Sequence, residues 1–448
     1  MLSRRNFLHA CIFGIGNFST KCTLSLPYKH TLSVSEYGAV GDGTTDDTVA
    51  IQNAINSGYK LQFEANKKYK ITSPLILKHG TKMGKTYNNL IDFNYCEIIP
   101  HFSDDYAIKI VSVGDVNIGH TNIAYFDLRN LTINLGASTT AKAIKIGDWE
   151  QFIDSFHYST ITNFLILHSV GERRTVTTIE NVRHVRFVGM VHRDCGVEVL
   201  ARRGKSFCGD LEFKTCEFAG NGKSRPLVLR AGDNAVNTES EVRGITFDNC
   251  DIYGSETLIE SIKFGAVGDI WFDKVQFDAP PLSKKGDSAL IIKASNKSRI
   301  YQLHFSNNYF VGYEGAAIIL SLINDPTILQ VEFTSCHFNN ITNRSALSGK
   351  AAIYANAFQA LAFNNCEFAD IIADSIFNFQ NVEQFKILGC KTSRCHQTKY
   401  LATLHGDSKN FIIANNIADV SQQVVYRDSS TQISKNFIIK DNVLFKIN

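Results

Sequence analysis

The sequence lacks the features that would place it in a membrane or on a nucleic acid. None of its uninterrupted apolar runs approaches the roughly 20 residues that a helix needs to span a bilayer. Its 46 Lys and Arg nearly balance its 43 Asp and Glu, so the formal net charge is only +3. Nucleic-acid-binding domains usually carry a pronounced basic patch. The composition therefore predicts neither a membrane span nor a nucleic-acid partner.

Paired cysteines are also missing. The chain has 11 cysteines, an odd number, and no Cys-x-x-Cys pair of the kind that binds metal or performs redox chemistry. This usage argues against a disulfide scaffold. Tryptophan is rare, with 2 residues, whereas phenylalanine is abundant, with 31. A narrow interior of stacked side chains would favour phenylalanine in this way.

What the sequence does contain is one short repeated pattern, apolar-x-aromatic-x-x-Cys/Asn-x-apolar. Its third position falls at Phe187, Phe213, Phe247, Phe272, Phe305, Phe333, Phe363, Ile387, Ile413 and Ile439. The spacing between copies runs from 24 to 34 residues, with a mean of 28. Apolar residues at alternate positions predict strands. A repeat of this length predicts a solenoid in which each unit buries its face against its neighbours.

A second strand-like run follows each copy after a dozen or so residues. These runs are Gly196–Leu200, Pro226–Arg230, Thr257–Glu260, Leu290–Lys293, Ala317–Leu320, Ala352–Tyr354 and Val424–Tyr426. No helical periodicity of useful length lies between the two runs of a period. Two or three short strands per turn, without helices, predict a parallel β-helix rather than a leucine-rich repeat or a propeller. The fold class is therefore all-β, and the segment Phe437–Phe445 is still repeat-like.

The Cys/Asn position of the pattern indicates stacking inside the solenoid. It is occupied by Met190, Cys216, Cys250, Val275, Asn308, Cys336, Cys366, Cys390, Asn416 and Asn442. Equivalent residues in a solenoid lie one strand spacing apart, about 4.8 Å. Buried thiols pack well at that spacing, and Asn amides hydrogen-bond along the stack. We expect these residues to be core.

The amino terminus predicts export. Ser3-Arg4-Arg5-Asn6-Phe7-Leu8 resembles the bacterial twin-arginine signal, and a short apolar stretch follows it. An ordinary basic start is the alternative interpretation. We expect residues 1–29 to be a signal peptide and the protein to be periplasmic or secreted. The β-helix domain then spans residues 30–448, with a cap at about 34–58 and regular coils at about 120–448.

The start of the folded domain resembles a known family. Tyr37-Gly-Ala-Val-Gly41-Asp-Gly43, followed by Asp46-Asp47-Thr-Val-Ala-Ile51-Gln-Asn-Ala, closely matches the amino-terminal motif of the pectate-lyase-like superfamily. The match covers about 25 residues, and the repeats extend the likeness in kind. The resemblance implies a single-stranded, right-handed parallel β-helix. It also implies a role like that of exported polysaccharide lyases, glycoside hydrolases or phage tailspikes.

The same segment has a physical interpretation as a cap over the first coil. Asp46 or Asp47 suits the N-cap of a short helix. Ile51, Ala54 and Ile55 mark its buried face, and Gly58 marks its end. Glycines at 38, 41 and 43 permit tight turns before it. The alternative, an acid or metal site at Asp42, Asp46 and Asp47, is weaker, since the family uses this motif architecturally.

Candidate site residues come from the two longest intervals of the repeat. The gaps of 34 and 33 residues place added loops at Gly232–Gly244 and Pro280–Ser288, and such insertions often border a binding face. Charged residues near them give catalytic candidates at Glu198, Arg230 and Glu260. Substrate-binding candidates are Asp194, Asp233 and Lys263, with Lys293 nearby.

Three kinds of chemistry stay open for these residues. Glu198 and Glu260, two coils apart with Arg230 between them, fit an inverting glycosidase. Arg230 or Lys263 acting as a base beside a uronate carboxyl fits a lyase. A solvated face of stacked opposite charges is the non-functional alternative. Asn237-Thr238-Glu239 is only a fragment of the polygalacturonase motif, so that assignment has no support.

The sequence thus predicts an exported enzyme that cleaves an acidic or cell-surface polysaccharide. The rival is a non-catalytic glycan-binding or tailspike-like protein, and epimerisation of polymer uronates is a weaker third option. No cofactor is expected. The family resemblance leaves calcium open, although no acidic cluster like that of pectate lyases is visible. A last strand without a cover needs a cap or a partner, so we expect a monomer or a homotrimer.

Overall fold

The computed structural model describes residues 31–82, 85–87, 89–113, 125–136, 140–147, 153, 159–168, 175–202, 206–220, 224–233, 239–254, 256–279, 287–295, 297–323, 327–328, 330–343, 350–395, 397–427 and 436–444. The predicted signal peptide, Asn237, Thr238 and most of the Pro280–Ser288 loop lie outside them. Among the described residues, no helix combines the length and apolar character needed to cross a membrane.

The fold is a parallel β-helix, which confirms the predicted class. Within the described residues, one sheet has fourteen strands, paired in parallel except for the antiparallel β5–β6 pair. Its strands are β5 (Leu75–Lys82), β6 (Lys85–Tyr87), β8 (Tyr106–Ser112), β10 (Lys142–Ile146), β12 (Thr175–Glu180), β15 (Gly196–Ala201), β18 (Leu227–Ala231), β21 (Thr257–Ser261), β24 (Leu290–Ser295), β27 (Ile318–Ile323), β31 (Ala351–Asn356), β34 (Ser375–Gln380), β37 (Tyr400–His405) and β40 (Gln423–Arg427). Each of the second strand-like runs predicted from the sequence lies in one of these strands.

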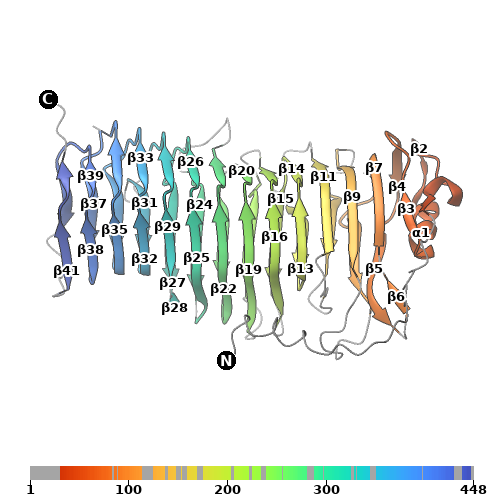
Figure 1. The fold of residues 1–448 in the computed structure, drawn as a ribbon, viewed down its shortest axis with the longest axis horizontal. Helices are drawn as coiled ribbons and strands as arrows, with labels where there is room; N and C mark the ends of the chain where they lie inside the picture. Colours follow the sequence, from red (N-terminus) through yellow and green to blue (C-terminus); the bar gives the residue numbers. More distant parts are fainter. Residues whose placement is uncertain are drawn as a thin grey trace, which may run out of the picture. The chain divides into compact units, whose positions relative to one another are not determined.

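The other sheet has twenty-eight strands and holds the repeated pattern itself. Its first part contains β1 (Thr31–Ser33), β2 (Asp42–Asp46), β3 (Lys60–Gln62), β4 (Lys68–Ile71), β7 (Asn89–Pro100), β9 (Phe126–Asn134), β11 (Ser159–Leu167), β13 (Arg183–Val188), β14 (Val191–Arg193), β16 (Phe207–Lys214), β17 (Glu217–Ala219), β19 (Ser240–Asp248), β20 (Asp251–Tyr253), β22 (Gly265–Asp273) and β23 (Gln276–Asp278). The remainder contains β25 (Arg299–Ser306), β26 (Tyr309–Val311), β28 (Thr327–Ile328), β29 (Val331–Thr334), β30 (His337–Asn339), β32 (Gln359–Asn364), β33 (Glu367–Ala369), β35 (Glu383–Leu388), β36 (Lys391–Ser393), β38 (Phe411–Ala414), β39 (Ile417–Ala418), β41 (Phe437–Lys440) and β42 (Val443–Leu444). Figure 1 shows these strands stacked in chain order from the cap to β41.

A left-handed backbone corner divides each copy of the pattern into two strands. In one coil, β19 ends at Asp248, Asn249 has φ of 52°, and β20 begins at Asp251. The same corner recurs with positive φ at Gly189, Thr215, Lys274, Asn307, Ser335, Asn365, Gly389, Asn415 and Asp441. Gly, Asn and Asp adopt this conformation more readily than other residues. The position just before Cys/Asn therefore turns the chain.

The phenylalanines of the pattern form a continuous stack inside the solenoid. Consecutive rings from Phe187 to Phe363 lie 4.6–4.8 Å apart, with interplanar angles of 3–12°. All of these rings are at most 1% exposed. The ring separation equals the strand spacing, because neighbouring strands pair in register, Phe213 opposite Phe247 and Phe247 opposite Phe272.

The Cys/Asn position is buried from Met190 to Asn416, as expected, and only partly buried at Asn442 in the last coil. Cys336 Sγ lies 3.2 Å from the Phe305 carbonyl of the preceding coil. Where the residue is Asn, its amide bridges coils: Asn308 donates Nδ2–H to the Phe272 carbonyl and accepts the Val275 N–H. These contacts satisfy backbone groups beside the corner. The nine described cysteines are free and buried.

The predicted cap is present, with one difference in detail. Helix α1 (Thr48–Ser57) buries Ile51, Ala54 and Ile55, and Gly58 ends it in a left-handed conformation. The side chain of Asp46 accepts the N–H of Thr48 at 3.1 Å, whereas Asp47 occupies the N-cap without a capping bond from its side chain. Its carboxylate instead accepts the N–H groups of Val40 and Gly41, at 2.7 and 3.0 Å. Asp47 thus secures the glycine-rich turn, and the motif is architectural here.

Coils begin well before residue 120, where we expected the regular coils to start. Strand β7 pairs in parallel with β3 and β4 on one side and with β9 on the other. In the fourteen-stranded sheet, β8 likewise joins β5 to β10. Strand β7 contains the aromatic-x-x-Cys spacing, as Phe93-x-x-Cys96, but β9 and β11 place Leu128 and Ile161 at the third position of the pattern, so the series of aromatic copies begins only at Phe187.

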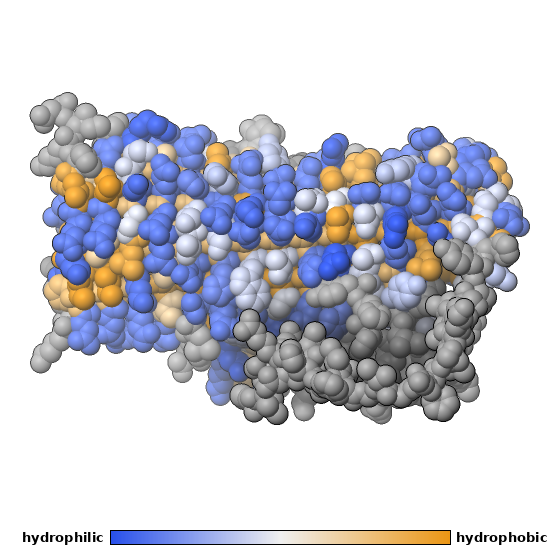
Figure 2. All heavy atoms as spheres, viewed as in Figure 1, coloured by the Kyte–Doolittle hydropathy of each residue, from blue (hydrophilic) through white to orange (hydrophobic). Residues whose placement is uncertain are grey.

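The last coil leaves interior positions open. Phe437 and Ile439 continue the apolar face of the pattern yet are each 37% exposed, and Val443 is 49% exposed. Figure 2 shows a mostly hydrophilic surface with hydrophobic residues gathered at the end that carries β41. The expectation of a cap or a partner at this end stays a prediction.

We predict that Phe247→Ala lowers the free energy of unfolding by about 3–5 kcal/mol, because it opens a cavity between two stacked rings. Denaturant unfolding followed by circular dichroism measures the change. Val49→Ala, at a 69% exposed helical position, serves as the control and should change stability by less than about 0.5 kcal/mol. Equal effects of the two substitutions would contradict the stack's role.

Candidate functional site

The outer face of the fourteen-stranded sheet carries two rows of side chains in register. We call row 1 the residues Lys109, Lys145, Thr178, Glu198, Val228, Leu258, Ile291, Ile319, Tyr354, Asn378, Thr403 and Tyr426. Row 2 comprises Glu180, Leu200, Arg230, Glu260, Lys293, Ser321, Asn356, Gln380 and His405. Each row places neighbouring side chains one strand spacing apart, so the face presents a periodic surface.

The predicted catalytic residues share this face but not one row. Arg230 and Glu260 are adjacent in row 2, and Arg230 donates its Nε–H to Glu260 Oε2 at 2.7 Å. Glu198 stands in row 1, where its register partner is Val228. Two strand spacings and a two-residue offset separate the backbones of Glu198 and Glu260 by about 12 Å. Arg230 therefore pairs with one glutamate and does not lie directly between the two.

The predicted substrate-binding residues lie at both edges of the face. Asp194 is exposed at a turn with φ of 60°, just before β15. Asp233 and Lys263 follow β18 and β21 by two residues, and Ala231 pairs with Ser261, so they lie on neighbouring coils. The structure thus brings Asp233 and Lys263 together and leaves Asp194 at the opposite edge.

Around Glu198 the structure assembles residues that sequence reasoning missed. Glu180 is fully buried and accepts two hydrogen bonds from Arg202, each 2.9 Å long. This partner raises the pKa of Arg202, and the charge of Glu198 adds to the effect. Within the described part of the chain, Glu198 itself has no ion-pair partner, and it is only partly buried. Glu198 is therefore the accessible carboxylate of this cluster.

Tyr106 completes the cluster from β8, three coils before Glu198. Its hydroxyl lies 2.8 Å from Thr178 Oγ1, next to Glu198 in row 1, and Lys142 lies over its ring at 5.1 Å. The signal for these residues was weak, because β8 precedes the first repeat copy and β12 is rich in threonine. The apolar run of β8, Ala107-Ile-Lys-Ile-Val111, does resemble those of the later strands.

The cluster has the residues for acid–base chemistry on a charged substrate. Glu180 and Glu198 are diagonal neighbours on adjacent strands, which separates their Cβ atoms by about 8 Å. Carboxyl groups about 6.5–9.5 Å apart suit an inverting glycosidase. However, the bidentate ion pair with Arg202 engages both oxygens of Glu180. The arrangement favours Glu198 as a single acid or base beside fixed positive charge.

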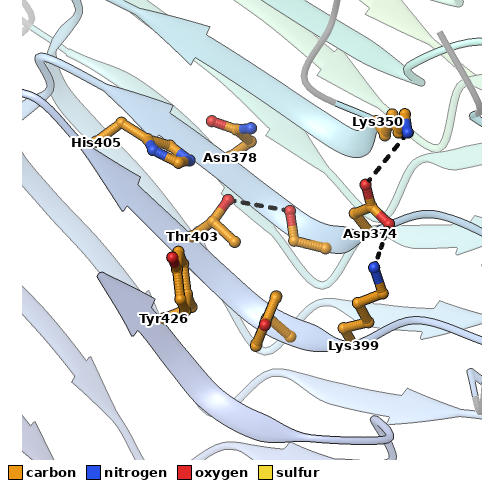
Figure 3. A pocket seen from close by; sticks show the side chains of 9 residues that line it. Lys350, Asp374, Asn378, Lys399, Thr403, His405 and Tyr426 are labelled. Carbon is orange, nitrogen blue, oxygen red and sulfur yellow. Dashed lines mark hydrogen bonds and ion pairs between the residues drawn. The ribbon is translucent and has the colours of Figure 1, made fainter. Parts of the chain in front are cut away.

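A cavity of about 380 Å³ opens at the other end of the same face. It is lined by Lys350, Asp374, Ser375, Asn378, Lys399, Tyr400, Thr403, His405 and Tyr426. Figure 3 shows Asp374 between the two lysines, with Nζ–Oδ distances of 3.8 Å to Lys350 and 3.2 Å to Lys399. The rings of Tyr400 and Tyr426 stack at 5.0 Å. Thr403 belongs to row 1 and His405 to row 2, so both rows lead into the cavity.

Between the Glu198 cluster and the cavity, row 1 is apolar. Val228, Leu258 and Ile291 form a buried cluster separate from the main core, with Ile319 packed against it. Row 2 supplies the polar neighbours of this strip, Arg230, Glu260 and Lys293. The face therefore changes from charged to amphipathic to aromatic along the solenoid axis.

A separate group of ionisable residues lies on the twenty-eight-stranded sheet. The Tyr301 hydroxyl donates to Glu241, and Arg243 Nε lies 3.5 Å from the same carboxylate. Burial raises the pKa of Asp269, and the charge of Glu241 raises it further. Because the Glu241 carboxylate already contacts Tyr301 and Arg243, we interpret this group as a structural network.

No metal site was predicted, and the described ranges contain no group of three or more His, Cys, Asp or Glu side chains arranged to hold a metal ion. Calcium binding stays a question that the family resemblance leaves open.

Comparisons with known proteins return structures but no sequence family. No protein-family model and no curated protein matches the sequence. Among solved structures, bacteriophage CBA120 tailspike protein 3 matches at 11% identity and a TM-score of 0.47, over 90% of this chain and 61% of that chain. This chain thus spans less than two thirds of that tailspike's length.

Two further matches come from bacterial proteins. The A-module of the Azotobacter vinelandii mannuronan C-5 epimerase AlgE6 matches at 13% identity and a TM-score of 0.44, over 93% of this chain and all of that one. PfbA, a surface adhesin of Streptococcus pneumoniae, matches at 12% identity and a TM-score of 0.41, over 90% of this chain and 92% of that one. At these identities the likeness does not extend to a substrate or an activity.

We predict that Arg202→Met destabilises the fold by about 3 kcal/mol, because it leaves the Glu180 carboxylate buried without a partner. The double variant Glu180→Leu/Arg202→Met should recover most of that loss, since it removes both charges. Denaturant unfolding of the two variants and the wild type measures the difference. A double variant no more stable than Arg202→Met would show that the ion pair does not account for the effect.

Proposed function

We propose that the protein is carbohydrate-active and takes an acidic polysaccharide across the fourteen-stranded sheet, in contact with the partly exposed side chains of rows 1 and 2. The observation that carries the proposal is the sequence of side chains along this one face. An accessible glutamate stands beside fixed cations at one end, and a cavity with two lysines and two stacked tyrosines opens at the other. Export, predicted from Arg4 and Arg5, would bring such a protein to extracellular or cell-surface polymers.

Acidic sugars are the favoured substrates because cations recur along the face. Arg202, Arg230, Lys293 and Lys399 project from it or border it at intervals of one to several coils. A guanidinium or ammonium group can bind a uronate carboxylate through charge-assisted hydrogen bonds. Tyr400 and Tyr426 offer ring surfaces on which a sugar can stack.

Glu198 is our candidate for the acid or base of cleavage. In a lyase it would remove the proton beside the uronate carboxyl while neighbouring cations stabilise the developing charge. In a hydrolase it would protonate the leaving oxygen. Arg230 fits a binding role better than that of a base, because a guanidinium keeps its proton in proteins and this one holds Glu260. Lys263 stays the alternative base at the edge of the face.

We predict that Glu198→Gln lowers kcat by at least about 100-fold with little change in binding, because acid–base groups typically contribute that much. A panel of uronate and capsular polymers would be followed by ultraviolet absorbance of unsaturated ends and by reducing-sugar release. The first signal identifies a lyase and the second alone a hydrolase.

Two controls make this experiment decisive. Glu260→Gln should weaken substrate binding through the loss of the Arg230 contact, and Asp47→Asn in the cap should leave kcat unchanged. Cleavage unaffected by Glu198→Gln would reject Glu198. Binding without cleavage of any polymer would favour the non-catalytic glycan-binding alternative, and an altered uronate configuration without cleavage would favour an epimerase.

We predict that Tyr426→Ala and Lys399→Ala each weaken binding of an acidic polymer by about tenfold, the loss of one ring or ion contact in a partly desolvated site. Isothermal titration at two salt concentrations would distinguish the ring contact from the ion contact, because salt screens only the contact made by the lysine. Lys440→Ala, on the other sheet and 62% exposed, is the matched control. Unchanged affinity in both Tyr426→Ala and Lys399→Ala would show that the cavity is not part of the binding site.

A further inference from the structure

A row of outward side chains on the twenty-eight-stranded sheet holds an exposed tryptophan. In register, the row reads Arg186, Glu212, Thr246, Trp271, His304 and Glu332. Trp271 is 41% exposed. An exposed indole on a strand otherwise flanked by polar side chains is unusual and points to a contact surface.

One face of the indole is covered by the next coil. The His304 ring stacks on Trp271 with a centroid distance of 5.7 Å and an interplanar angle of 10°. On its other side, His304 Nδ1 lies 3.8 Å from Glu332 Oε2. The imidazole is therefore held between an aromatic ring and a carboxylate, and it supports the indole as a flat surface facing along the solenoid axis.

The other face of the indole is open, because its neighbour in the row is small. Thr246 occupies that position, and the next residue beyond it is Glu212. Trp271 and Glu212 are two strand spacings apart, about 10 Å. A ring stacked on an aromatic side chain lies about 4.5–5 Å from it. The space over Thr246 thus has the width of one six-membered ring, with an indole on one side and a carboxylate on the other.

We propose that this slot, bounded by Trp271, Thr246 and Glu212, binds one residue of a neutral glycan. The C–H face of a pyranose would stack on the indole, and its hydroxyls would donate to Glu212. The proposal concerns a different sheet from the face assigned to the acidic polysaccharide, and it does not depend on that assignment.

The charges around the slot select a neutral ligand. Arg186 Nε lies 2.6 Å from Glu212 Oε2, Lys214 Nζ lies 3.8 Å from Asp248, and Lys274 Nζ lies 3.2 Å from Asp273. Each of these nearby cations lies beside a carboxylate, and the Glu212 carboxylate that borders the slot would repel the carboxylate of a uronate. A protein partner is disfavoured because an interface needs a contiguous apolar centre, and the neighbours of Trp271 in its row are polar.

The chain contains a close copy of this arrangement without the slot. Tyr309 stacks on His337 at 4.8 Å, and His337 Nδ1 lies 3.3 Å from Glu367 Oε2. Tyr309 is 48% exposed, but the row position on its other side carries the longer Gln276. Tyr309 is therefore a matched control, an exposed aromatic ring of the same construction with a filled neighbouring position.

The test uses the fluorescence of Trp271, which becomes the sole tryptophan in the full-length Trp149→Phe protein, because the sequence has only 2. Hexasaccharides of glucose, mannose, galactose and N-acetylglucosamine would be titrated alongside an oligouronate. We expect at least one neutral oligosaccharide to change the emission and saturate, and the oligouronate to bind Trp271 at least about tenfold more weakly.

Substitutions measured by isothermal titration then separate the slot from a general surface effect. Thr246→Trp should abolish binding by filling the slot while leaving Trp271 in place, and Thr246→Ala should preserve it. Trp271→Ala should weaken binding at least about tenfold, whereas Tyr309→Ala should not. Circular dichroism confirms that each variant is folded.

The proposal is overturned if none of the neutral oligosaccharides binds, if Thr246→Trp binds as the wild type does, or if Tyr309→Ala loses as much affinity as Trp271→Ala. Cleavage or binding of acidic polymers should be the same in Thr246→Trp and the wild type. The experiments can therefore reject the slot on the twenty-eight-stranded sheet and the site on the fourteen-stranded sheet independently.

Discussion

In-register parallel pairing between successive coils is the constraint on which the rest of this structure depends. It places equivalent residues one strand spacing apart, so the side chain at a repeat position must pack against the equivalent side chains of the two neighbouring coils. Phenylalanine rings satisfy this condition by stacking in parallel, as Phe247 does between Phe213 and Phe272. Cysteine and asparagine satisfy it next to the corner, where they contact backbone groups of the preceding coil.

The same constraint acts on the outside of the solenoid, with different consequences. Exposed positions need no apolar continuity, so a row can pass from acid to base to aromatic within a few coils. Arg230 and Glu260 become an ion pair because they are register neighbours. Trp271 keeps one open face because its register neighbour is threonine. Both arrangements follow from which residues occupy adjacent positions in a row, and neither depends on proximity in the sequence.

Much of the fold was predictable because it rests on periodic apolar residues. The alternation around Phe213 and Phe247 identified the strands, and the run Leu290–Lys293 identified a strand of the fourteen-stranded sheet. The early coils were not predicted, although β7 carries the later spacing in Phe93 and Cys96, because the next two coils have Leu128 and Ile161 where the later ones have phenylalanine. Of the two aspartates predicted to serve the start of the helix, Asp46 accepts the Thr48 N–H, whereas the Asp47 carboxylate binds the N–H groups of the glycine turn.

By itself the sequence determined the solenoid, its capping segment and the inward-facing positions, because apolar periodicity is a local property of the chain. Only the tertiary structure decided which charged residues meet. A shift of two positions along a strand puts Glu198 in a different row from Arg230 and Glu260, and loops of unequal length between strands conceal that shift in the sequence. Register is set by the pairing of whole coils, so the spatial neighbours of Glu198, Glu180 and Trp271 can be identified only from the stacked coils.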